Sequence, residues 1–115
     1  MVERRSRRSH DPLVALHYKL SATRREGALD ALVVADADGL VVAGAGAWPL
    51  CEEIAAYAPI LEDAGEQALP SRLAGRVQVR HGDGLWVCAV REEGADPSTV
   101  DWNGLEHAVS RILAA

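Results

Sequence analysis

Cys51 is the residue of this sequence whose type and position come nearest to nucleophilic chemistry. It lies in the first turn of a predicted helix, where the helix dipole can lower the pKa of a thiol and favour the reactive thiolate. A catalytic thiol also needs a base and a group that orients the base. The sequence has four histidines, and none of them stands in a recognisable local pairing with Cys51: His10, His17, His81 and His107.

A glycine pair, Gly44-Ala45-Gly46, lies between a predicted strand and a predicted helix. Backbone amides at this position of a chain can hold a phosphate group. The segment has neither the third glycine of a dinucleotide site nor the Gly-Lys-Ser or Gly-Lys-Thr of a P-loop. The glycines are therefore predicted to form a turn into the helix.

Metal ligands are not grouped in this sequence. The four histidines and the cysteines Cys51 and Cys88 show no pair at metal-ligand spacing. Asp36 and Asp38 with Gly39 resemble a fragment of a calcium loop, but the third acid and the distal glutamate are missing. We expect no metal, no cofactor and no catalytic residue, so the sequence predicts that the protein is not an enzyme.

The composition is that of one globular domain. The chain has 115 residues, of which 49% are apolar and 25% are charged, enough to build one modest core. No apolar run is long enough to span a bilayer, and no secretory signal is recognisable. We therefore expect a cytoplasmic protein without a membrane span, in which Cys51 and Cys88 stay reduced and pack as small hydrophobic residues.

Charge is distributed unevenly along the chain. Residues 1–26 hold seven Lys or Arg against three acids, whereas the remainder holds five against fourteen. Residues 1–10 are predicted to form a flexible basic tail and residues 11–115 the domain. Because phosphate neutralisation needs a basic face, the acidic domain argues against nucleic-acid binding, although the tail alone could touch an anionic partner.

Hydrophobic periodicity predicts the order helix, strand, strand, helix, strand, strand, helix. The expected strands are residues 31–35, 40–43, 76–80 and 85–90; the expected helices begin at Asp11-Pro12, near Leu50 and at Asp96-Pro97-Ser98. Two hairpins account for the strands, so the predicted fold class is α+β with an antiparallel sheet. Within the first hairpin, Asp38-Gly39 is expected to supply the residues of positive φ.

Pro59 and the segment between Gly65 and Gly75 interrupt the predicted helices and strands. Pro59 falls within the second predicted helix, where it predicts a kink or a break into two pieces. The segment between Gly65 and Gly75 contains turn residues and is predicted to be a connection.

The segment from Asp30 to Ala43 has a short hydrophobic strand, an acidic turn closing on Gly39, and then Leu-Val-Val. This pattern, with the order of the other elements, resembles the roadblock family over residues 11–114. That family includes dynein light chains and bacterial regulators of small GTPases. Its members usually have five strands, whereas four are predicted here.

The resemblance implies a homodimer or a paralogous heterodimer whose sheets join and whose helices form a platform for a small Ras-like GTPase or a motor complex. The second helix would pack against its symmetry mate. By position, the implied dimer or partner interface consists of Leu50, Ile54, Ala58, Leu61, Val77 and Val79. The same residues could instead form the core of one chain, because an apolar helical stripe looks the same in both cases.

A second function remains open at this stage. Small-ligand sensor modules of the GAF and PAS type have similar sheets and hold a ligand in a cavity. A sensor is expected to show an enclosed pocket with convergent polar groups, whereas a scaffold is expected to show a filled core and an apolar interface.

Overall fold

The computed structural model describes residues 12–95 and 100–114 of the chain. The predicted basic tail of residues 1–10 and the residue Asp11 lie outside the described residues, so the boundary between tail and domain stays a prediction. In the part that the structure describes, no helix is long and apolar enough to cross a membrane.

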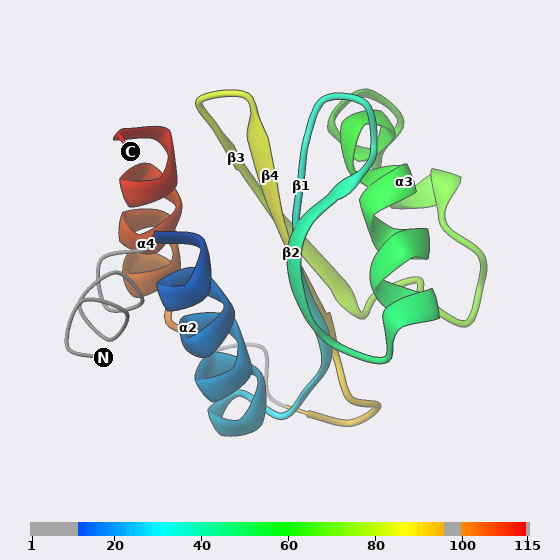
Figure 1. Ribbon diagram of the computed structural model, residues 1–115. Helices are drawn as coiled ribbons and strands as arrows, with labels where there is room; N and C mark the ends of the chain where they lie inside the picture. Colours follow the sequence, from blue (N-terminus) through cyan, green and yellow to red (C-terminus); the bar gives the residue numbers. More distant parts are fainter. Residues whose placement is uncertain (1–11, 96–99, 115) are drawn as a thin grey trace, which may run out of the picture.

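The fold has three layers, with a sheet between two layers of helices (Figure 1). The predicted element order is confirmed. The elements are α2 (Pro12–Glu26), β1 (Leu29–Ala35), β2 (Val41–Gly46), α3 (Trp48–Ala64), the 3-10 helix η1 (Gly65–Ala68), β3 (Val77–Gly82), β4 (Leu85–Arg91) and α4 (Trp102–Ala114). α2 and α4 cover one face of the sheet, and α3 covers the other (Figure 1).

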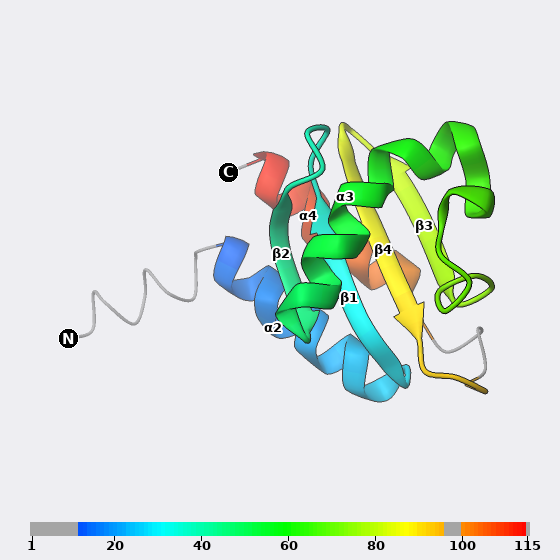
Figure 2. The ribbon, with the colours of Figure 1, turned by 90° about the vertical axis from the view of Figure 1, so that its right-hand side faces the viewer.

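The sheet has the strand order β2-β1-β4-β3, and its neighbouring strands are antiparallel. β3 is therefore an edge strand, beside β4 (Figure 2). Between α3 and β3 the chain forms η1 and a series of turns rather than a strand. Within residues 12–95 and 100–114, the expectation of four strands, one fewer than the roadblock family usually has, is confirmed.

Each face of the sheet carries its own hydrophobic core. The core under α3 contains Ile54 and Ala58 of the helix with Val33 and Cys88 of the sheet. The core on the other face contains Leu16, Leu20 and Leu105 of the helices with Leu32 and Val34 of β1. Because both faces of β1 are covered, its residues from Ala31 to Ala35 are all buried and read as one apolar run.

The glycine pair is part of β2 and not the predicted turn. Gly44 and Gly46 pair with Val33 and Ala31 of β1, and the chain leaves the strand only after Gly46. Gly44 also lies under Cys51 of α3, where a Cβ would lie 3.3 Å from Sγ. The glycines therefore allow β1 and α3 to approach β2 closely.

The start of the last helix was predicted too early. α4 begins at Trp102, after the non-helical residues 100 and 101, while residues 96–99 lie outside the described residues. The carboxylate of Asp101 accepts the backbone N–H of Gly104 at 3.0 Å and so caps the first turn. Lys19 of α2 also donates to Asp101 at 2.7 Å. The helix therefore begins at the residue after Asp101, whose carboxylate binds both the N–H of Gly104 and the ammonium of Lys19. The contact with Lys19 joins residues far apart in the sequence and could not be predicted from local pattern.

The first hairpin turn differs in detail from the prediction, because Gly39 alone has positive φ there, at 78°, and Asp38 does not. Asp36 organises the turn: its carbonyl oxygen accepts the N–H of Gly39, and its carboxylate accepts those of Asp38 and Leu40. In the second hairpin, Asp83 and Gly84 have φ of 54° and 82°, as a two-residue turn between twisted strands requires.

Helix α3 continues through Pro59 as one element, so the predicted break into two pieces was wrong. Pro59 lacks the N–H that would bond to the carbonyl oxygen of Ala55. The β1–β2 turn packs against this part of the helix, since a Cβ on Gly39 would lie 3.4 Å from that oxygen and 3.3 Å from Cα of Ala56. Tertiary packing of α3 onto the sheet keeps the helix whole.

Replacing Ala28 with glycine is expected to stabilise the protein. Ala28 follows α2 in the left-handed region, with φ of 52°, where an L-residue with a Cβ is strained. After the larger backbone entropy of an unfolded glycine is subtracted, the gain should be about 0.5 kcal/mol. Urea denaturation followed by circular dichroism measures it. Ala74→Gly, at an exposed turn residue without positive φ, should instead lower stability.

Candidate functional site

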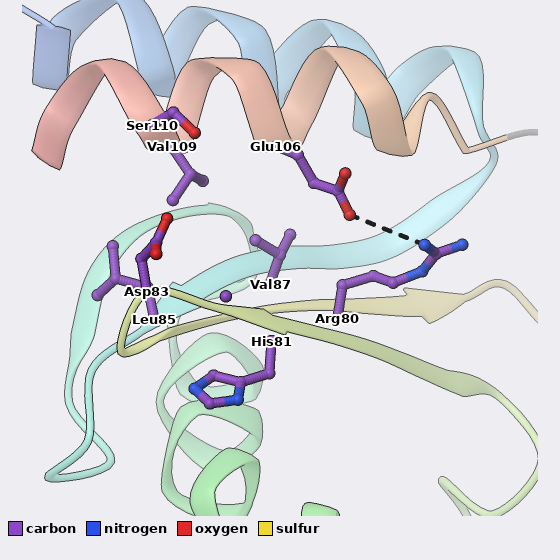
Figure 3. Close-up of a pocket in the computed structure, with 9 residues that line it drawn as sticks. Arg80, His81, Asp83, Leu85, Val87, Glu106, Val109 and Ser110 are labelled. Carbon is purple, nitrogen blue, oxygen red and sulfur yellow. Dashed lines mark ion pairs between the residues drawn. The ribbon is translucent and has the colours of Figure 1, made fainter. Parts of the chain in front are cut away.

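A hollow with a volume of about 300 Å³ lies between the β3–β4 hairpin and α4 (Figure 3). Leu85, Val87 and Val109 supply its apolar lining, and Arg80 and Glu106 lie toward one another on its rim, 3.7 Å apart. Arg80, Glu106 and other rim residues are exposed to solvent. The hollow is therefore an open surface cleft and differs from the enclosed pocket expected of a ligand sensor.

Arg80 is engaged by two partners beside this cleft. Its guanidinium lies over the ring of Trp102, 5.1 Å from the centroid, in addition to the ion pair with Glu106. The neighbouring His81 projects toward α3, away from the cleft, and stacks on Trp86 with ring centroids 4.2 Å apart (Figure 3). These contacts join β3 to α4 and to β4, which gives the charged residues of the cleft a structural role.

Both thiols are buried, and burial decides their chemistry. Burial raises the pKa of Cys51, outweighing the influence of Arg24, so the predicted lowering by the helix dipole is not the dominant effect. Burial also raises the pKa of Cys88 to about 12. The Sγ atom of Cys51 lies 3.5 Å from the carbonyl oxygen of Ala45 and donates to it. In the described part of the chain, no group of three His, Cys, Asp or Glu residues could hold a metal ion.

We expect neither cysteine to react with DTNB in the native protein at neutral pH, and both to react after unfolding in urea. The unfolded chain ionises its thiols from about pH 8.5 upward, whereas the folded chain keeps Cys88 protonated, with a pKa of about 12. The contribution of Cys88 to stability is therefore present at neutral pH and is lost as pH rises through this window. Rapid reaction of the native protein would contradict this burial.

The structure separates the six residues of the predicted interface by their burial. Ile54 and Ala58 have no exposed surface and pack on the sheet, and Leu61 and Val77 are also buried. Leu50 and Val79 are half-buried at the border of the same core. The apolar stripe was interpreted either as a dimer interface or as the core of one chain. For Ile54 and Ala58, the core of one chain explains the burial. A role of the set in a dimer stays a prediction.

Leu61, Val77 and Val79 do come together, at the edge of the sheet. With Gly65 and Leu69 they line an apolar hollow of about 170 Å³ between the end of α3, η1 and β3. The hollow lies on the α3 side of β3, the strand at the sheet edge. Backbone groups at such an edge can pair with a further strand.

A second apolar feature lies on the outer side of α3 and was not predicted from the sequence. Trp48, Glu52, Ala56 and Ile60 follow one another at four-residue spacing, and all four are exposed. Trp48 exposes 52% of its surface and Ile60 exposes 50%. The four-residue spacing was available in the sequence, but a helix start near Leu50 left Trp48 outside the helix. We call Trp48, Glu52, Ala56, Ile60 and Asp63 the outer face of α3.

Comparison with solved structures identifies this arrangement. A roadblock/LC7 domain from Streptomyces avermitilis matches with a TM-score of 0.60 and 20% sequence identity, over 88% of this chain and 97% of that one. The chain has the roadblock fold. No protein-family model and no curated protein sequence matches it.

Two MglB structures share this roadblock fold with the chain. One, described as MglB with a tetrameric arrangement, has a TM-score of 0.59 and 22% identity and covers 90% of each chain. The gliding protein MglB from Thermus thermophilus has a TM-score of 0.58 and 20% identity, over 90% of this chain and 89% of that one. At these identities the similarity establishes the fold alone.

In this roadblock-fold chain, the two apolar features lie on one side of the sheet. α3 lies over the sheet on this side (Figure 2), and the hollow lined by Leu61 and Val79 lies between the end of the same helix and β3. The opposite side of the sheet is covered by α2 and α4 together. The α3 side is therefore the candidate interaction surface.

Proposed function

We propose that this protein is one subunit of a dimeric regulatory scaffold that acts on a small Ras-like GTPase or a motor complex. The observation that carries the proposal is the roadblock fold, which is shared with MglB over 90% of the chain. The family resemblance supplies the role, since the roadblock family includes dynein light chains and bacterial regulators of small GTPases. The mate within the dimer is a second copy or a paralogue.

The α3 side of the sheet supports an assembly role. An exposed tryptophan and an exposed isoleucine on one helix face are apolar surface that a partner can cover. The edge of β3 adds backbone groups that a partner strand can pair with, beside an apolar hollow for one of its side chains. Leu50 and Val79, which are half-buried, border this surface and belong to the proposed interface.

Within this proposal the protein is not an enzyme, and hydrolysis of the nucleotide belongs to the GTPase. The buried, protonated thiols and the paired charges at the cleft between the β3–β4 hairpin and α4 support this division. The reduced cysteines agree with the proposed location in the cytoplasm.

The test measures GTP hydrolysis and nucleotide release by each purified Ras-like GTPase of the source organism, with and without this protein. We expect one GTPase to bind the protein and to change one of these rates. Light scattering across a dilution series, alone and with the GTPase, reports the assembly. No binding and no change of rate with any GTPase would overturn the GTPase proposal. A thermal shift with a small metabolite would then favour the sensor alternative.

A further inference from the structure

The helices α2 and α4, on the side of the sheet away from the outer face of α3, leave a hollow of about 260 Å³ between them. They run in opposite directions (Figure 1), and Lys19 of α2 contacts Asp101 at the start of α4. On each helix the lining residues recur at spacings of three and four, which place them on one helix face. We call the surface that they form the α2–α4 groove: Pro12, Ala15, Leu16 and Lys19 of α2, and Gly104, His107, Ala108 and Arg111 of α4.

The floor of the α2–α4 groove is made of small and apolar residues. Leu16 has no exposed surface, and Ala15 and Ala108 are small enough to let the backbone of a further segment approach. At Gly104 a Cβ would lie 2.7 Å from Nζ of Lys19, so the glycine leaves the space that the ammonium group occupies. The hollow above this floor can therefore take one apolar side chain of a partner.

The ionisable residues that line the groove are all basic. His107 and Arg111 are exposed, and within the described residues neither has an ion pair with an acid. Lys19 uses one of its N–H donors on Asp101 and has two more. Glu106, the acid next to His107 in the sequence, is turned toward Arg80 at the other cleft. The groove thus offers N–H donors to an anion, and a guanidinium suits a carboxylate in particular.

The charge of the whole chain follows the same division. Residues 1–26 and 101–115, the segments that contain α2 and α4, carry eight Lys or Arg and five acids, whereas residues 27–100 carry four and twelve. An anionic partner is therefore attracted to the α2–α4 side and repelled by the rest of the domain. A membrane or a nucleic acid presents its charge over a wide area and would also meet Asp101 and Glu106. A peptide can place a few carboxylates at the basic positions alone.

We propose that the α2–α4 groove binds an acidic segment of a partner protein, with one apolar side chain in the hollow and Asp or Glu carboxylates at His107 and Arg111. Burial of the apolar side chain supplies affinity, and the ion pairs select an acidic partner. The groove lies on the opposite side of the sheet from α3. The inference therefore does not rest on the proposed GTPase role, and it gives the chain a second partner surface.

The test uses a fluorescein-labelled helical peptide of Glu, Ala and Leu, with Glu and Leu on one face, and measures its binding to the full chain by fluorescence anisotropy. We expect binding that weakens as salt rises, and none to the same peptide with Gln in place of Glu. In the variant His107→Glu/Arg111→Glu the affinity should fall about tenfold at low salt. Amide shifts in the NMR spectrum of the wild type should change at Ala15, Gly104 and Ala108 when the peptide binds.

The matched control is His17→Glu/Arg25→Glu. It makes the same two changes at exposed positions of α2 outside the groove, and Arg25 lies in the last turn of α2 as Arg111 does in that of α4. Its affinity for the peptide should stay close to that of the wild type. Equal weakening in both variants, no weakening in either, or no binding to the wild type would overturn the inference. Amide shifts confined to other elements would also overturn it, as would binding to phosphatidylglycerol vesicles but not to the peptide.

Discussion

Gly46→Ala is expected to lower the free energy of unfolding by about 3–5 kcal/mol. Gly46 ends β2 with φ of 110°, a conformation that residues with a Cβ rarely adopt. A Cβ there would lie 3.0 Å from Cα of Ala31 and would overlap the carbonyl oxygen of Asp30. Both atoms belong to the backbone of β1, the strand paired with β2, so no side chain can move aside. The strands would have to separate at this end.

The measurement is urea denaturation followed by tryptophan fluorescence and circular dichroism. Since folded domains are stable by about 5–15 kcal/mol, the loss would be a large part of the total. Gly75→Ala is the control: Gly75 also has positive φ, at 79°, but a Cβ added there would have no atom within 4 Å. It should lose only the conformational part, which is about 0.5 kcal/mol after the larger backbone entropy of an unfolded glycine is subtracted. Equal losses for both variants would show that the close approach of β1 does not matter.

Ile54→Ala is expected to cost about 2–5 kcal/mol of stability at every protein concentration. Ile54 is a residue of α3 that is fully buried between the helix and the sheet, in the core that includes Val33 and Cys88. Truncation would leave a cavity among residues of the same chain. The loss therefore does not depend on a partner, although the family resemblance implied an interface position for Ile54.

Ile60→Ala is the matched control, because it is the same change on the same helix at a half-exposed residue. It should change the free energy of unfolding by less than about 1 kcal/mol, and it should weaken association with the partner. Denaturation curves at two concentrations, together with partner binding, separate the two effects. A small loss for Ile54→Ala with a large loss of association would place Ile54 in an interface and contradict the intramolecular core.

Local patterns were sufficient for the order of elements. The strand of Val33 and Val34, the turn at Gly39 and the hairpin at Asp83-Gly84 all follow from residues adjacent in sequence. The number of strands was also predicted from the sequence, because the segment from Gly65 to Gly75 is rich in turn residues.

Contacts between distant segments decided the remaining features. α4 begins at Trp102 because Asp101 both caps it and binds Lys19 of α2. The helix α3 continues through Pro59 because packing on the sheet outweighs one missing hydrogen bond. β2 extends through Gly46 because β1 lies close enough to pair with it.

The sequence by itself determined the α+β class, the two hairpins and the resemblance to the roadblock family, since these depend on local conformational preference and on hydrophobic period. Only the tertiary structure decided which apolar residues of α3 face inward. A helical stripe packs equally well against its own sheet or against a partner, and the spacing of Ile54 and Ala58 is the same in both cases. Burial by the sheet assigns Ile54 to the core and leaves Ile60 on the surface.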